Sequence, residues 1–174
     1  PPNNWKASFE GSAWTFDEAT GQYYLHLFAP QQPDLNWTNE AMRRDVYDMM
    51  NWWFEKGVDG FRMDVINFIA KEPGLPDAPT GEDTPDAVLV NPGRLSVNHP
   101  DVHSLLQEMR REVLSKYDVT TVGECHGIEP EDGALYTGAA RGELDMVFQF
   151  DVKWLVAHRQ LDDALERKDR RCQV

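Results

Sequence analysis

Cysteine is scarce in this sequence. Its 174 residues include two, Cys125 and Cys172, which is too few for the disulfide framework of a small secreted domain. We therefore expect the protein to work in a reducing compartment, the cytoplasm. Long apolar runs are also missing, since no stretch approaches the ~20 residues that a membrane-spanning helix needs. We expect no membrane association.

Positive charge is in deficit. The chain has 17 Lys and Arg against 30 Asp and Glu, for a formal net charge of -13. Nucleic-acid binding needs a basic surface, so this class of function is excluded. An acidic, solvated surface is the simplest explanation of the charge. The 41% hydrophobic content is ordinary for a globular domain.

A start methionine is missing as well. The chain opens with Pro1-Pro2-Asn3-Asn4-Trp5, which is neither an initiation site nor the charged beginning of a signal peptide. We expect an internal cut, with more of the parent protein upstream.

The spacing of apolar residues predicts two helices. The first begins at Thr38 or Asn39 and ends before Gly57, a residue suited to the position after a helix. The second covers about residues 101–116. The apolar faces predicted for them consist of Met42, Val46, Met49, Met50, Trp53 and Phe54, and of Val102, Leu105, Leu106, Met109, Val113 and Leu114.

Strands are predicted near residues 58–64, 119–124 and 144–150. Residues 1–37 indicate an irregular region with a short strand or two, and residues 73–100 a Pro- and Gly-rich insertion too polar for a core element. Residues 152–170 suggest a charged final helix. The alternation of helices and strands favours a parallel sheet with helical crossovers, either open or part of a barrel, because three strands cannot close an eight-stranded one.

Two carboxylates fall at strand ends. Asp64 and Glu124 end successive strands, so both side chains are expected at the edge where barrel enzymes keep their active sites. Adjacent strands lie ~4.8 Å apart, which suits the ~5–5.5 Å between the two carboxyl groups of a retaining glycosidase. Arg62, two residues before Asp64, points to the same side of its strand. Spacing alone leaves the alternative open that these carboxylates only meet solvent or cap a helix.

Three segments, in this order, resemble motifs of the α-amylase superfamily, in its oligo-1,6-glucosidase subgroup. Residues 32–36, Gln-Pro-Asp-Leu-Asn, are similar to the signature near the end of the protruding domain B. Residues 57–67, Gly-Val-Asp-Gly-Phe-Arg-Met-Asp-Val-Ile-Asn, resemble the fourth-strand motif with the nucleophile, and residues 121–124, Thr-Val-Gly-Glu, the fifth-strand motif with the acid/base. The resemblance covers about residues 2–151.

The resemblance implies an α/β fold that is a fragment of a (β/α)₈ TIM barrel. It would run from about the third helix through the sixth strand and the helix after it. Residues 1–37 would be the end of the inserted domain B, and residues 38–174 the partial catalytic barrel. The Asp and His of the first family motif and a third carboxylate on the seventh strand would lie outside this chain.

The resemblance also implies a role for each site residue. Asp64 would be the nucleophile, Glu124 the general acid/base and Arg62 the arginine that holds the nucleophile. Val65 follows the nucleophile, where valine accompanies α-1,6 cleavage, although valine is also a common strand residue. His126 stands where the family often has Met-Pro or Ala-Asn and would line the subsite of the leaving sugar. No metal ligand is expected, since no second His, Cys or acid lies at a ligand spacing from His126.

The expected function is a retaining α-glucosidase that hydrolyses α-1,6 bonds of isomalto-oligosaccharides. A trehalose-6-phosphate hydrolase or an α-1,4-glucosidase of the same family is the nearest alternative. Two other classes are a barrel ectodomain of an amino-acid transporter heavy subunit, which tends to lose the carboxylates, and a small acidic binding module. We expect a small oligosaccharide as substrate, a monomer at full length, and no cofactor in these residues, with a structural calcium ion elsewhere in the parent protein left open.

Overall fold

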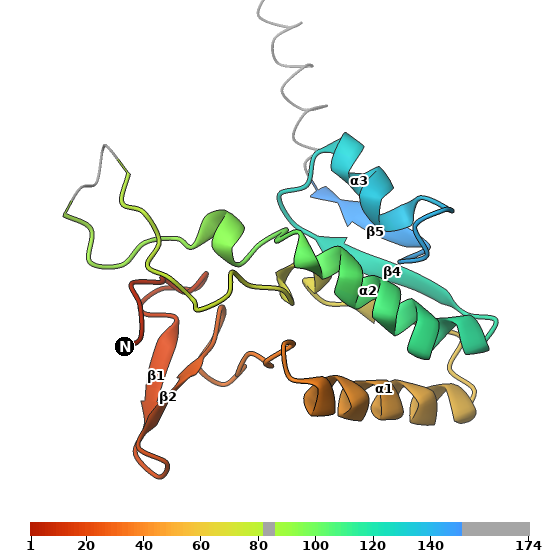
Figure 1. The fold of residues 1–174 in the computed structure, drawn as a ribbon, viewed down its shortest axis with the longest axis horizontal. Coiled ribbons are helices and arrows are strands. Elements are labelled where there is room, and N and C mark those ends of the chain that lie inside the picture. Colours follow the sequence, from red (N-terminus) through yellow and green to blue (C-terminus); the bar gives the residue numbers. More distant parts are fainter. Residues whose placement is uncertain (82–85, 151–174) are drawn as a thin grey trace, which may run out of the picture.

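The computed structural model describes residues 1–81 and 86–150, and the helix predicted at residues 152–170 lies outside them. Figure 1 shows the elements in chain order. The strands are β1 (Trp14–Asp17), β2 (Gln22–Leu25), β3 (Gly60–Met63), β4 (Thr120–Cys125) and β5 (Met146–Gln149), and the helices are α1 (Glu40–Glu55), α2 (Asp101–Glu112) and α3 (Pro130–Thr137). Short 3₁₀ turns cover Ile66–Phe68, Gly93–Leu95 and Leu114–Lys116. None of the described helices is long and apolar enough to cross a membrane.

The central sheet is parallel, in the order β3-β4-β5. Met63 pairs with Gly123, and Glu124 pairs with Phe148. The three predicted strands and their parallel direction are therefore confirmed. Gly60 explains how closely β3 and β4 approach, because a Cβ at this position would lie 1.9 Å from the carbonyl oxygen of Thr120.

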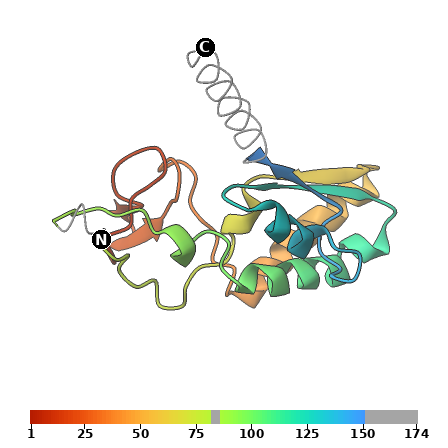
Figure 2. The same ribbon diagram turned by 90° about the horizontal axis from the view of Figure 1, so that it is seen from above.

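Helices α1, α2 and α3 cover one face of this sheet, and within residues 1–81 and 86–150 no helix covers the other (Figure 2). The covered face contributes Met63 and Cys125 to a core with α1, α2 and α3. Parallel strands are normally buried on both faces. A parallel sheet covered on one side only is what an arc of a (β/α)₈ barrel looks like, with its bare face turned to the barrel interior.

Helix α1 begins as predicted, but its buried face is rotated. The Oδ1 atom of Asn39 accepts hydrogen bonds from the backbone N–H groups of Ala41 and Met42, at 2.9 and 3.3 Å. The predicted core positions Met49 and Trp53 are exposed, while Tyr47 is buried. The prediction was wrong there because it counted apolar residues only, and a tyrosine can be buried in the core as well.

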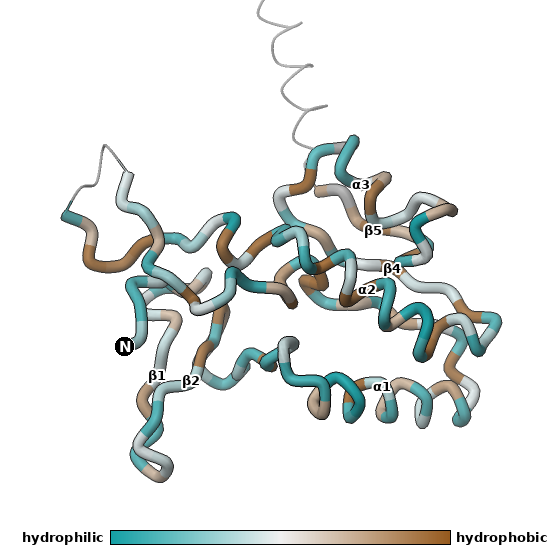
Figure 3. Tube along the Cα trace, viewed as in Figure 1, coloured by the Kyte–Doolittle hydropathy of each residue, from teal (hydrophilic) through white to brown (hydrophobic). Residues whose placement is uncertain are grey.

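Helix α2 buries the face predicted for it. Val102, Leu106 and Met109 are all buried, and hydrophobic and hydrophilic stretches alternate along this helix in Figure 3. The helix ends earlier than predicted, and residues Leu114–Lys116 form a 3₁₀ turn. Helix α3 was missed. Its start carries a proline in the first turn followed by Glu131 and Asp132, a signal that indicates a helix N-terminus.

The N-terminal region has a hydrophobic cluster of its own. Trp5 is fully buried, donates from Nε1 to the carbonyl of Pro76 at 2.9 Å, and pairs with Val90. Ala78 is buried in the same cluster. The expectation that residues 73–100 are too polar to enter a core was therefore wrong, because their few apolar side chains pack on the N-terminal residues.

Candidate active site

The bare face of the sheet carries the two predicted catalytic carboxylates. Asp64 comes directly after β3, and Glu124 is the penultimate residue of β4. Arg62 pairs with Val122, two residues before Glu124. Since side chains alternate along a strand, Arg62 and Glu124 project from the same face.

One guanidinium joins the two carboxylates. The Nη1 atom of Arg62 donates to Oδ1 of Asp64, and its Nη2 atom donates to Oε2 of Glu124. The Asp64 side chain is 67% exposed and the Glu124 side chain 13%. The hydrogen bond from Arg62 holds the pKa of Asp64 below its usual range. Asp64 is thus kept ionised, which is the state a nucleophile needs.

The backbone turns sharply after Asp64. Val65 has φ 37° and ψ 45°, in the left-handed region, which a β-branched residue adopts only under strain. The turn leads into the 3₁₀ turn Ile66–Phe68 and leaves Asp64 beyond the end of the strand. Val65 therefore lies outside the strand, and the alternative that it is an ordinary strand valine is wrong.

Glycine is required just before Glu124. A Cβ at Gly123 would lie 2.6 Å from Cδ1 of Leu144 and 2.9 Å from Cγ2 of Ile66, both buried side chains. On the other side of Glu124, Cys125 is fully buried. Burial raises the pKa of its thiol to about 12, so this thiol stays neutral and takes no part in nucleophilic chemistry.

His126 lies beside Glu124. Its Nε2 atom is 3.2 Å from Oε1 of Glu124. The prediction placed His126 at a sugar subsite, and its proximity to Glu124 was not foreseen. Sequence reasoning also missed Asn67 and Asn98, whose side chains bind the loop that holds His126. Single polar residues in loops have no periodicity that would mark them.

Across residues 1–81 and 86–150, no group of three or more His, Cys, Asp or Glu side chains is arranged to hold a metal ion.

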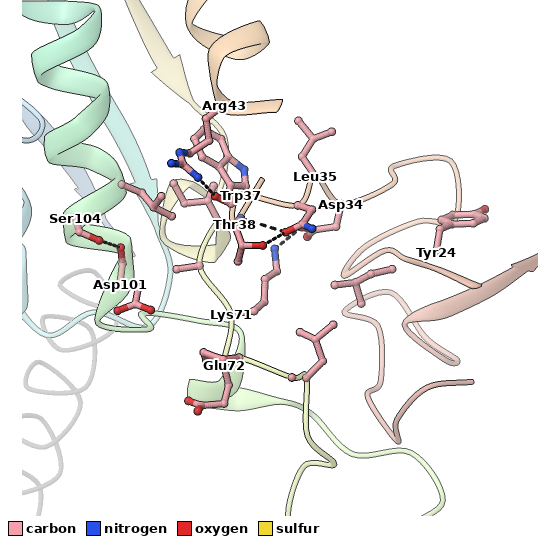
Figure 4. Close-up of a pocket in the computed structure, with 18 of the residues that line it drawn as sticks. Tyr24, Asp34, Leu35, Trp37, Thr38, Arg43, Lys71, Glu72, Asp101 and Ser104 are labelled. Atoms are coloured by element: carbon pink, nitrogen blue, oxygen red, sulfur yellow. Dashed lines mark hydrogen bonds and ion pairs between the residues drawn. The ribbon is translucent and has the colours of Figure 1, made fainter. Parts of the chain in front are cut away.

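A separate cavity of about 960 Å³ opens between the β1–β2 hairpin, the start of α1 and the start of α2 (Figure 4). Lys71 donates to Asp34 in its wall, and burial raises the pKa of Asp34 and lowers that of Lys71. Neither Asp64 nor Glu124 lines this cavity.

Comparison with known proteins identifies the family to which the sequence is similar. The model of the family described as alpha amylase, catalytic domain, matches residues 1–168. The chain is 59% identical over 150 residues to an oligo-1,6-glucosidase of Parageobacillus thermoglucosidasius, a match that covers 86% of this chain and 26% of that protein. It is 54% identical over 165 residues to an alpha-glucosidase of Pediococcus pentosaceus, covering 94% of this chain and 27% of that protein.

A solved structure is similar over the same region. The crystal structure of trehalose-6-phosphate hydrolase from Bacillus licheniformis matches with a TM-score of 0.77 and 51% sequence identity, covering 86% of this chain and 25% of that one. The chain thus spans about a quarter of the length of the relatives that it matches.

Proposed function

The chain belongs to the family of alpha-amylase catalytic domains, and we propose that the protein it is part of is a retaining α-glucosidase that hydrolyses α-1,6 bonds of isomalto-oligosaccharides. Its fold is part of the (β/α)₈ barrel of this family. The observation that carries the proposal is the contact of Asp64 and Glu124, on neighbouring parallel strands, with the single guanidinium of Arg62. A retaining glycosidase requires two carboxyl groups only ~5–5.5 Å apart, and a shared guanidinium holds two carboxyl groups near each other.

The reaction follows from these positions. Asp64, ionised, attacks the anomeric carbon of the glucosyl unit while Glu124 gives a proton to the departing glycosidic oxygen. The carbon–oxygen bond to the leaving sugar breaks and a glucosyl–Asp64 ester forms. Glu124, now a carboxylate, takes a proton from water as the water oxygen attacks the same carbon. The ester breaks, the sugar leaves with its original configuration, and both carboxyl groups return to their starting states.

The relatives support the α-1,6 preference. An oligo-1,6-glucosidase is the relative with 59% identity, and Val65 stands directly after Asp64. Trehalose-6-phosphate hydrolase remains the second candidate, because the solved enzyme of that name shares 51% identity over the same region. Asp64 and Glu124, which transporter subunits with this barrel tend to lose, are both present.

Four further expectations belong to the same proposal. Residues 1–37 are the end of the inserted domain B, and residues 38–174 are part of the barrel. The parent enzyme is a monomer that takes a small oligosaccharide as its substrate. It works in the cytoplasm, which suits the free, buried thiol of Cys125. The chain by itself is inactive, because the remaining sugar-binding groups belong to the other three quarters of the protein.

The test uses the full-length enzyme and its Glu124→Gln variant. Proton NMR should show that isomaltose first releases the α-anomer of glucose, as retention requires. Glu124→Gln should slow isomaltose hydrolysis at least ~100-fold, yet slow the first step on an activated aryl α-glucoside much less, because that leaving group needs no proton. Release of the β-anomer first, or equal losses on both substrates, would contradict the mechanism.

A further inference from the structure

We propose that His126 is a positioning residue for the acid/base, holding the oxygen of Glu124 that Arg62 leaves free. The inference rests on the proposed function and deepens it. Arg62 donates to Oε2 of Glu124, whereas His126 meets Oε1 through Nε2, at 3.2 Å. With a partner on each oxygen, the plane of the carboxyl group is fixed. A glutamate otherwise loses reaction geometry through the rotation of its side chain, and orientation contributes much of an enzyme's rate.

The imidazole ring is itself held in place by two aromatic rings. It stacks on Phe150, with the ring centroids 4.8 Å apart and the planes 11° from parallel. Phe68 meets it edge-on, at 6.5 Å and 86°. Both phenylalanines lie just after a strand or in the turn that follows one. The ring therefore keeps its orientation toward Glu124 without any contribution from substrate.

The backbone of the same loop is anchored by two asparagines. The Nδ2 atom of Asn67, a fully buried residue, donates to the carbonyl of His126 at 2.7 Å. Asn98, in the left-handed conformation with φ 52°, donates from Nδ2 to the carbonyl of Gly127 at 2.9 Å. Oδ1 of Asn98 accepts from Nδ2 of Asn67 and from the hydroxyl of Tyr136, at 2.7 and 2.9 Å. The loop is thus tied both to the turn after β3 and to α3.

The Nε2–H group of His126 can donate to Oε1 of Glu124 in both halves of the reaction. A carboxyl oxygen keeps a free lone pair when the acid proton lies on the side that faces the leaving sugar, so this hydrogen bond does not compete with proton transfer. Arg62 also acts only as a donor. Among the described residues, His126 contacts the carboxyl group of Glu124 and interacts electrostatically with Asp64. Arg62 contacts both of these carboxyl groups. The role of His126 is therefore to orient Glu124 in each half of the reaction.

The test compares His126→Phe and His126→Gln in the full-length enzyme. Phenylalanine keeps a flat ring on Phe150 but loses the bond to Glu124, while glutamine keeps a donor and an acceptor. His126→Phe should lower kcat/KM for isomaltose about 10-fold, the worth of one hydrogen bond to a charged group. The first step on an activated aryl α-glucoside should change less than about threefold, because it needs no acid.

Dependence on the leaving group separates orientation of the acid/base from a structural role, because a structural defect would lower the rates on both substrates alike. His126→Gln should recover most of the rate on isomaltose. Equal losses on both substrates, a change in KM alone, or loss of the folded enzyme in both variants would overturn the proposal. If Glu124→Gln discriminates leaving groups but His126→Phe does not, only this inference fails; if wild type cleaves no α-glucoside, the proposed function fails.

Discussion

Loss of Arg62 should affect both carboxylates at once. Its replacement by methionine would measure how much the shared guanidinium contributes to kcat/KM. A hydrogen bond to a charged group contributes ~1.5–3 kcal/mol when it is sheltered from water. The Glu124 side chain is 13% exposed, so we keep that value for its bond to Arg62. Asp64 is 67% exposed, and solvent screening reduces its pair to ~1 kcal/mol or less. The sum is about 1.5–4 kcal/mol, which corresponds to roughly a 10- to 1000-fold loss of kcat/KM.

The same replacement should also move the acid limb of the pH profile in a definite direction. Arg62 is the first cause of the lowered pKa of Asp64, and in the proposed mechanism activity requires the ionised form of this carboxylate. Activity therefore falls as pH drops through that pKa. In Arg62→Met the pKa of Asp64 returns toward its usual value, so the acid limb of kcat/KM should move to higher pH. Arg62→Lys keeps the charge but cannot bridge two carboxylates with a planar fork, and its activity should be intermediate.

The assay is kcat/KM for isomaltose between pH 4 and 8 with the full-length enzyme. Arg44→Met is the matched control. Arg44 also forms an ion pair, with Glu40, but on the exposed surface of α1, where such pairs contribute little. We expect the control to equal wild type. If Arg62→Met stays within about threefold of wild type and keeps its acid limb, the idea that one guanidinium organises the two carboxylates is refuted.

Two further predictions concern the ends of β3. Val65→Thr keeps the β-branch and hence the left-handed strain at this residue, so any change in specificity reflects the hydroxyl. The variant should shift the ratio of isomaltose to maltose hydrolysis toward maltose by up to ~10-fold. An unchanged ratio would show that Val65 does not determine specificity. Gly60→Ala forces a methyl group to within 1.9 Å of a backbone oxygen, which should destabilise the enzyme by ~3 kcal/mol or more. Gly21→Ala, with φ 67° but open space, should cost only ~1 kcal/mol; equal melting temperatures for these two variants would show that β3 and β4 are not so tightly packed.

Strands and one helix face were predictable because their signals are local and periodic. The α2 face repeats at helical spacing, and its core positions are buried as predicted. The carboxylates at the ends of two strands could also be placed near each other from the sequence, because parallel strands bring these ends to one edge. That Arg62 reaches both of them was only half foreseen. Its bond to Glu124 depends on the register of β3 against β4, which the sequence does not encode locally.

Tertiary contacts account for what could not be predicted. Met49 and Trp53 are exposed although their spacing fits a buried face. The buried side of α1 is set by long-range contacts such as those of Phe54 with Phe61 of β3 and with Tyr117. Val65 resembles any strand valine in sequence, and its left-handed backbone follows from the turn that Ile66 and Asn67 make into the core. Asn67 and Asn98 both anchor the backbone of His126, and they lie 59 and 28 positions before it in the chain.

Covalent labelling of Asp64 is the direct test of its assignment as the nucleophile. A mechanism-based fluorosugar slows release of the glucosyl–enzyme ester, so the full-length enzyme should accumulate it. Peptide mass spectrometry should then find the sugar on Asp64, in the peptide that contains residues 60–67. Asp64→Ala should take no label and lose activity by orders of magnitude, while Glu124→Gln should still be labelled by a reagent with an activated leaving group. A sugar attached to any other carboxylate would contradict the assignment of Asp64 as the nucleophile.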